Sequence, residues 1–263
     1  MHPPMHDPAA ANWIGLWTLY MREVRRFAKV YAQTMLAPIV TTLLFLAVFA
    51  LALGGAARSV EGIPFMQFLA PGLIIMAIAQ NAFANTSSSL MIAKIQGNIV
   101  DTLMPPLTPF ELNFGLAMGG VTRGVVVGMA VALAMSIFVE LPLHSIGHIL
   151  FHGLMASLML SQLGILGAIW ALKFDHIASV TNFVITPLSF LSGTFYSINR
   201  LPETAQTIAH FNPFFYMIDG FRYGFIGYAD SNVLTGMIVM ASINIALWTL
   251  CTRCFTTGYK LKA

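Results

Sequence analysis

The sequence predicts an all-α integral membrane protein with about six transmembrane helices. Of its 263 residues, 57% are hydrophobic and only 9% are charged, whereas a soluble domain carries about 25% charged residues. Apolar runs recur along the chain, and most approach the ~20 residues that cross a bilayer. No Ser/Gly-rich linker interrupts them, so residues 1–263 are predicted to form a single membrane domain.

The predicted spans cover residues 35–53, 64–92, 113–139, 149–172, 177–191 and 233–251. We expect the first to be retained, because the residues before it lack the apolar core of a cleavable signal peptide. With six spans, both termini lie on the same side. Lys and Arg concentrate on that side, whereas the other side carries Arg58, Arg200 and Arg222. This imbalance predicts cytoplasmic termini.

A basic, amphipathic helix is predicted before the first span, within residues 12–32. Asn12 is suited to cap it. Apolar side chains follow at steps of three and four: Trp13, Leu16, Tyr20, Val24 and Phe27. Charged side chains gather near its end: Arg22, Glu23, Arg25 and Arg26. Such a helix lies on a membrane surface, although the basic cluster could also serve only as a topology signal.

Polar side chains mark the second half of the second span. Gln80 and Ser88 share one helical stripe, and Asn81, Asn85 and Ser89 lie beside it. Polar groups inside a span face protein or water rather than lipid. They therefore either line a pathway or bind neighbouring helices through hydrogen bonds.

Residues 94–112 are too polar and too rich in proline to span. Gly97, Asn98 and Pro105-Pro106 indicate a short helix between two turns. At about 19 residues the segment is longer than most helix–helix links, which favours a role of its own over an ordinary connection.

The third span contains glycines four residues apart, at Gly115 and Gly119 and at Gly120, Gly124 and Gly128. This spacing predicts close helix packing. Arg123 lies within the span, where a charge is costly. We expect it to extend to the nearer surface or to pair with Glu111.

Three histidines, His144, His148 and His152, are spaced four residues apart at the start of the fourth span. On a helix they would share a face, and such a face could hold a metal. No Cys or acidic ligand lies close in sequence, so interfacial or packing histidines are favoured and no metal site is assigned.

The stretch from Thr181 to Tyr228 is the most irregular part of the chain. Pro187 lies inside an apolar run, the run breaks at Ser192-Gly193, and charges then alternate with aromatic residues. Broken backbone at membrane depth requires protein or a water-filled cavity around it. The stretch is therefore either a working element of the protein or an aromatic loop at the interface.

Several functions are disfavoured by what the sequence lacks. It contains no G-x-x-x-x-G-K-[ST], HExxH or GxSxG motif, so we expect neither a nucleotide site nor an enzyme. The net charge of +3 reflects topology signals, and no nucleic-acid partner is expected. A transporter without its own energy source depends on an ion gradient or on a separate ATPase.

The segment from Pro187 to Tyr196, followed by Leu201-Pro202, Asn212-Pro213, Tyr216 and Arg222, resembles the signature of ABC-2 type permeases, the membrane subunits of one class of ABC exporters. The resemblance extends to the chain length, the span order and the basic N-terminal helix. It is greatest for the short-looped bacterial subgroup of nodulation-factor and YadH-like permeases.

The resemblance implies a homodimer in the bacterial inner membrane that binds two ATPase subunits, with ATP and Mg²⁺ on those partners and no cofactor on this chain. It implies that residues 94–112 couple to the ATPase, through Gln96, Gly97, Asn98, Asp101 and Leu103. Residues 193–228 would form re-entrant helices at an outer gate, with Phe190, Gly193, Phe195, Tyr196, Asn212, Pro213 and Arg222. Arg222 would be an anchor at the outer rim that pairs with Asp219 or Glu203. Spans two and five would line the pathway, through Gln80, Asn81, Asn85, Thr181, Asn182 and Thr186.

Aromatic and Met-rich walls suit an amphiphilic substrate such as a drug, a lipid or a lipid-linked saccharide. Two alternatives to an ATP-driven exporter remain open. One is an ion-coupled carrier. The other is a membrane enzyme for lipid-linked substrates that uses His144, His148 and His152.

Overall fold

The computed structural model describes residues 12–52, 59–60 and 62–261, so the predicted outer charge Arg58 lies outside the described residues. Its elements, in chain order, are α1 (Trp13–Ala28), α2 (Tyr31–Ala52), β1 (Ser59–Val60), β2 (Ile63–Pro64), α3 (Phe65–Ile95), α4 (Ile99–Leu103), α5 (Pro109–Met135), α6 (Ile146–Trp170), α7 (Phe174–Val180), η2 (Thr181–Ile185), α8 (Thr186–Leu191), η3 (Ile198–Arg200), α9 (Glu203–His210), α10 (Pro213–Ile226) and α11 (Val233–Thr257).

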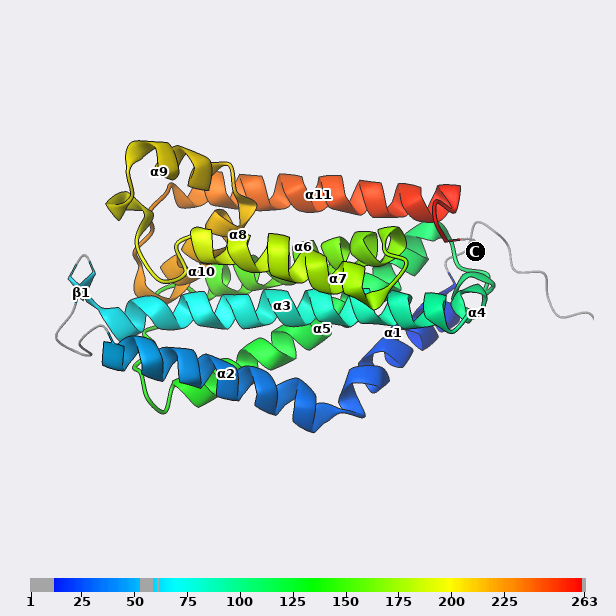
Figure 1. The fold of residues 1–263 in the computed structure, drawn as a ribbon, viewed down its shortest axis with the longest axis horizontal. Helices are drawn as coiled ribbons and strands as arrows, with labels where there is room; N and C mark the ends of the chain where they lie inside the picture. Colours follow the sequence, from blue (N-terminus) through cyan, green and yellow to red (C-terminus); the bar gives the residue numbers. More distant parts are fainter. Residues whose placement is uncertain (1–11, 53–58, 61, 262–263) are drawn as a thin grey trace, which may run out of the picture.

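The predicted all-α membrane fold is confirmed. In the described part of the chain, α2, α3, α5, α6 and α11 are long and apolar enough to cross a membrane. The helices α3, α6 and α11 run along the long axis of the molecule (Figure 1). One end, here named the α9 end, carries β1 and α9, and the opposite α4 end carries α4.

α3 is the central helix of the bundle. It packs against α5, α6 and α10, and its apolar stretch is mostly buried, whereas the apolar stretches of α2 and α11 are mostly exposed. The buried side chains of Phe68, Leu69 and Ile75 in α3 form the centre of the core. The outward faces of α2 and α11 therefore present apolar surface to lipid or to another chain.

The glycines of α5 allow the close packing that their spacing predicts. A Cβ atom on Gly124 would lie 2.8 Å from the carbonyl oxygen of Ile78 in α3 and would also collide with Ser157 of α6. A Cβ atom on Gly120 would likewise collide with Ser161 of α6 and approach the Ala82 carbonyl oxygen of α3, and one on Gly128 would collide with the Ile78 side chain of α3. Gly120 and Gly124 thus bring α5 close to the backbone of α3, and Gly128 makes room for an α3 side chain, as small residues do in membrane bundles.

α5 begins four residues before its predicted start because Thr108 and Glu111 form a capping box. The Thr108 hydroxyl accepts from the Glu111 amide (3.2 Å), and the Glu111 carboxylate accepts from the Thr108 amide (2.7 Å). Pro109 occupies the first turn, where its missing N–H has no cost. The cap fixes this helix end in the polar segment rather than in the apolar run.

The fifth apolar run forms an irregular helix from α7 through the π-helical η2 to α8. Pro187 accounts for the irregularity, because a proline ring crowds the carbonyl four residues earlier, here that of Phe183 inside η2. The helix ends at Leu191, and Gly193 follows with φ of 76°, which glycine adopts without steric cost. The predicted break at Ser192-Gly193 is confirmed.

After this break the chain returns into the protein as α10. Its 14 residues are fewer than the ~17–25 needed to cross a bilayer, and most of them are buried against neighbouring helices. Asn212 caps it by accepting from the Phe214 amide (3.1 Å) and also donates to Ser192 Oγ (2.7 Å). The side chain therefore holds the start of α10 against the end of α8.

Candidate functional site

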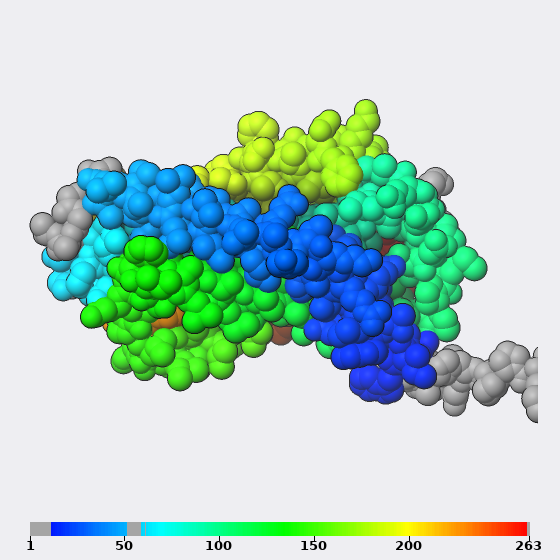
Figure 2. All heavy atoms as spheres, turned by 90° about the horizontal axis from the view of Figure 1, so that it is seen from below, coloured from blue at the N-terminus to red at the C-terminus, as the bar shows by residue number. Residues whose placement is uncertain are grey.

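A cavity of about 710 Å³ lies between α2, α3, α5 and the end of α8. Figure 2 shows α2 crossing this side of the molecule, with α5 on one flank and the α7–α8 segment on the other. Its polar lining includes Arg26, Gln33, Gln80, Asn81 and Arg123, and its apolar lining includes Phe45, Leu73, Met76, Phe190 and Phe195. Because α3 runs from the α9 end to the α4 end, the apolar wall lies toward the α9 end.

The helix α1 is joined to α3 through a buried carboxylate. Glu23 is only 1% exposed; it accepts from Ser89 Oγ at 2.8 Å and from the guanidinium of Arg26 at 3.2 Å. Arg26 in turn donates to Asn85 Oδ1 at 2.9 Å. Arg22 completes the cluster at 3.2 Å from Glu23. A polar face of α1 is thus fixed to the polar stripe of α3.

The face of α1 that packs on α5 includes part of the predicted apolar row, since Leu16 lies beside Gly115 and Tyr20 Oη lies 2.9 Å from Thr122 Oγ1. Leu19, Glu23 and Phe27 are buried there, whereas Trp13 is 73% exposed. The helix therefore has two apolar faces, one against the protein and one carrying Trp13 and Trp17 outward. A helix that only rested on lipid would need a single apolar face, so the predicted interfacial helix accounts for only part of these contacts.

Arg123 is placed differently from both sequence expectations. It lies near the middle of α5, where it donates to Asn81 Oδ1 at 3.3 Å and borders the cavity. It neither extends to the surface nor reaches Glu111, whose carboxylate accepts from Thr108 and from the Asn12 amide (2.7 Å). Its Nε is buried with no hydrogen-bond partner among the described residues.

The α9 end of the cavity is covered by aromatic rings. Phe195 stacks on Phe49 of α2 with ring centroids 4.6 Å apart, and it lies 5.3 Å from Phe190 and 6.3 Å from Phe45. These four rings join α2 to the segment around the Gly193 break. They include Phe190 and Phe195, two of the residues expected at an outer gate.

A second cavity of about 420 Å³ adjoins the first along α3, and α7, η2 and α8 form its other wall. Of the residues predicted to line a pathway, Gln80, Asn81, Thr181 and Thr186 border this cavity. The other two residues in that expectation lie elsewhere. Asn85 is fully buried and holds Arg26, and Asn182 lies exposed beside the cavities rather than in their walls.

Arg222 is buried in the bundle rather than placed at the outer rim. It donates to the carbonyls of Phe68 (3.2 Å) and Gly193 (2.6 Å), and its guanidinium lies 3.8 Å from the Phe68 ring centroid. The expected pairing with Asp219 or Glu203 is wrong, because among the described residues the ion pairs join Glu23 to Arg22 and to Arg26. Arg222 instead ties α3 to the backbone at the Gly193 break.

Two carboxylates organise the α9 end through hydrogen bonds that the sequence did not predict. Asp219 accepts from the amides of Asp230 (2.8 Å) and Ser231 (2.9 Å). Asp230 accepts from Ser197 Oγ (2.6 Å) and from Tyr228 Oη (2.7 Å). Burial, and after it the bond to Asp230, raises the pKa of Tyr228, so its hydroxyl stays protonated and donates. No spacing in the sequence signals this network.

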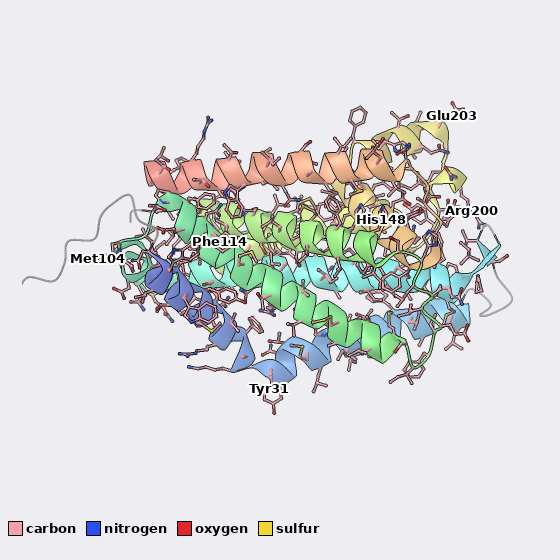
Figure 3. All side chains as sticks on the ribbon, turned by 180° about the vertical axis from the view of Figure 1, so that it is seen from behind. Tyr31, Met104, Phe114, His148, Arg200 and Glu203 are labelled. Carbon is pink, nitrogen blue, oxygen red and sulfur yellow. The ribbon has the colours of Figure 1, made fainter. Side chains whose placement is uncertain are left out.

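At the α4 end, residues 94–112 form the expected short helix between turns. Ile99 and Thr102 are buried, whereas Gln96, Gly97, Asn98 and Asp101 are exposed and Leu103 is half-buried. Met104 lies at this tip of the molecule, opposite Arg200 and Glu203 (Figure 3). The tip presents exposed polar groups beside exposed Val100 and Met104.

Two basic side chains fix this tip to the rest of the bundle. Arg22 Nη1 of α1 donates to Thr102 Oγ1 at 3.1 Å. Lys94 Nζ donates to the carbonyls of Ala168 (3.0 Å) and Ala171 (2.7 Å) at the end of α6. Cations at a helix C-terminus satisfy its free carbonyls. Arg22 thus joins α4 to α1, and Lys94 joins the end of α3 to the end of α6.

His148 and His152 form hydrogen bonds within the protein, whereas the exposed His144 lies against Tyr223 with ring centroids 5.2 Å apart. His148 bonds Ser145 Oγ at 2.8 Å, and the buried His152 bonds the carbonyl of His148 at 2.9 Å and fills the space beside Gly220. In the described part of the chain, no three His, Cys, Asp or Glu side chains are grouped so as to hold a metal.

The ABC-2 type transporter family model matches residues 15–226, which contain the cavities, the α4 tip and the Gly193 break. The chain belongs to the ABC-2 type transporter family. It is also 35% identical to the inner membrane transport permease YadH of Escherichia coli strain K12, over 95% of this chain and 98% of that protein. Nodulation protein J of Rhizobium leguminosarum bv. viciae is 24% identical over 84% of this chain and 85% of its own length.

As an ABC-2 transport permease, the protein is a multi-pass membrane component of an ABC transporter in the inner membrane. Membership in this family implies association with an ATPase subunit. Two regions of this ABC-2 fold therefore need a functional explanation: the exposed α4 tip and the cavity beside α2.

Proposed function

We propose that this chain is the permease of an ATP-driven exporter of amphiphilic substrates, and that it works as a homodimer with two separate ATPase subunits. ATP and Mg²⁺ would bind those subunits, and this chain would carry no cofactor. The cavity beside α2 is the observation that carries the proposal. It combines a polar wall with an aromatic wall, as a pathway for an amphiphile requires.

The α4 tip is proposed as the surface that docks in the ATPase. Gln96, Gly97, Asn98 and Asp101 project from it, and Leu103 anchors it. The tip lies at the same end as the basic cluster of α1, and positive charge favours the cytoplasmic side. Both termini are accordingly proposed to be cytoplasmic, with the α9 end facing outward.

Movement of the ATPase would reach the cavity through α1. Arg22 links the α4 tip to α1, and Glu23 and Arg26 link α1 to α3 beside the cavity. Packed helices shift as rigid bodies, so a displaced tip would move one wall of the cavity. The aromatic rings around Phe195 and the buried Arg222 would form the gate at the outer end.

The exposed faces of α2 and of the α7–α8 segment are proposed as the surface for a second copy. Both flank the cavity, and both leave large apolar side chains exposed, including Leu44, Val48 and Phe183. Pairing of two copies on this side would enclose the two cavities and complete the pathway.

Purification of the tagged chain in mild detergent, followed by mass spectrometry, tests the class. We expect an ATPase with a P-loop in about equal amount. Asp101→Arg should abolish that association, whereas Glu203→Arg, a matched charge reversal on the exposed surface of α9, should leave it unchanged. Recovery of the chain alone, even after crosslinking, would contradict the exporter proposal. Equal behaviour of the two variants would contradict the docking assignment.

A further inference from the structure

We propose that the cavity beside α2 selects amphiphiles with an anionic head group, such as a phosphate or a carboxylate, and that Arg123 is the residue that binds this group. The inference deepens the proposed function and rests on it, because it names the substrate class of that cavity. Its support comes from the charges and the unfilled hydrogen-bond donors in the cavity wall.

The described lining of the cavity carries positive charge and no carboxylate. Arg26 and Arg123 both border it, and none of its described lining residues is Asp or Glu. The carboxylate of Glu23 lies behind Arg26, at 1% exposure, and is shared with Arg22. Two cations that face one cavity repel each other, and an anion between them would relieve that repulsion.

Arg123 has donors left to bind such an anion. Among the described residues it donates to one amide oxygen, that of Asn81 at 3.3 Å, and its buried Nε has no hydrogen-bond partner. A guanidinium offers five donors in a fork that matches carboxylate and phosphate oxygens. Arg26, by contrast, already donates to Glu23, Asn85 and Ser88, so it supplies mainly charge.

A second copy of this chain offers little to neutralise Arg123. Within the described residues, acidic side chains lie at helix ends or in loops, apart from the engaged Glu23 and the buried Asp219. The remaining wall fits the rest of an amphiphile. Gln33, Gln80 and Asn81 surround the charged part, and Leu73, Phe45 and Phe195 line the part toward the α9 end, where an acyl or aromatic tail would lie.

The test measures binding by the complete chain in a neutral maltoside detergent, by native mass spectrometry and without the ATPase. The probes are lauryl phosphate, zwitterionic dodecylphosphocholine and inorganic phosphate. We expect lauryl phosphate to bind at least tenfold more tightly than the other two. Arg123→Gln should weaken the binding of lauryl phosphate by about tenfold to a hundredfold, as loss of a charge-assisted hydrogen bond does. It should leave the affinity for dodecylphosphocholine unchanged. Arg253→Gln, the same change on the exposed surface of α11, is the control.

A second variant keeps Arg123 in place. Asn81→Asp would set a carboxylate at the 3.3 Å contact and should abolish the preference for lauryl phosphate while the protein stays folded. Equal binding of the anionic and zwitterionic probes, or equal effects of Arg123→Gln and Arg253→Gln, would overturn the proposal. If inorganic phosphate bound as tightly as lauryl phosphate, the proposal that the cavity selects amphiphiles would be overturned. Because no ATPase is present, these failures are distinct from failure of the exporter proposal.

Discussion

Replacement of Glu23 by glutamine tests whether this carboxylate holds α1 to the bundle. Glu23 accepts hydrogen bonds from Arg22, Arg26 and Ser89 and is 1% exposed. Glutamine keeps the shape of the side chain but removes the charge and turns one acceptor into a donor that faces the guanidinium of Arg26. The variant therefore leaves two arginines without their counter-ion.

The expected cost is about 2 kcal/mol. A hydrogen bond to a charged group contributes about 1.5–3 kcal/mol, and breaking a fully buried ion pair costs about 3–5 kcal/mol. The side chains of Arg26 and Arg22 are 29% and 46% exposed, so water partly solvates them and the lower range applies. The loss should appear first as local opening of α1, because this cluster is what joins α1 to α3.

Two measurements check this prediction. Denaturant unfolding in detergent should show the loss of stability, and amide hydrogen exchange should show lower protection across α1 while α6 keeps its protection. Glu203→Gln, an exposed carboxylate on α9, is the control and should stay within about 0.5 kcal/mol of the wild type. If Glu23→Gln were as stable as this control and α1 as protected, the cluster would not be what fixes α1.

Three further substitutions test the packing and the links of the fold. Gly124→Ala should destabilise the bundle by about 1–3 kcal/mol through overpacking against α3. The control Gly147→Ala, at the exposed start of α6 with open space around it, should be neutral or stabilising. Equal unfolding midpoints of the two variants would refute the close approach of α5 to α3. Arg222→Lys keeps the charge but loses the guanidinium fork that reaches carbonyls of α3 and of the Gly193 break, so thermal stability should fall by about 1–3 kcal/mol, and unchanged stability would show that the fork is dispensable. Thr102→Val removes the hydroxyl that Arg22 bonds; export should fall while the ATPase still co-purifies and hydrolyses ATP, and export at the wild-type rate would remove this bond from the coupling path.

The helices could be predicted because their signals are local. Apolar runs located the long helices, and Pro187 and Gly193 marked the irregular helix and its end, since each acts through its own backbone. Glycine spacing predicted the contact face of α5 for the same reason. The start of α5 was not predicted, because the capping box at Thr108 lies in the polar segment before the apolar run that begins at residue 113.

The pairings of charged groups could not be predicted, because they join residues far apart in the chain. Arg123 finds Asn81, 42 positions away, and Arg222 reaches the Phe68 carbonyl, 154 positions away. The sequence suggested carboxylate partners for both arginines, since opposite charge is the simplest compensation. In the folded protein, amide and carbonyl oxygens serve instead, because a buried cation needs acceptors rather than a formal counter-charge.

The polar stripe of α3 explains how one helix can serve both regions of the site. The sequence left open whether this stripe lines a pathway or binds neighbouring helices, and the structure divides it. Toward the α4 end, Asn85 and Ser89 bind the charged cluster of α1. One turn closer to the middle, Gln80 and Asn81 line both cavities. A displacement of α1 that pulls on Asn85 therefore moves the residues that face the cavity, because both sets belong to one continuous helix.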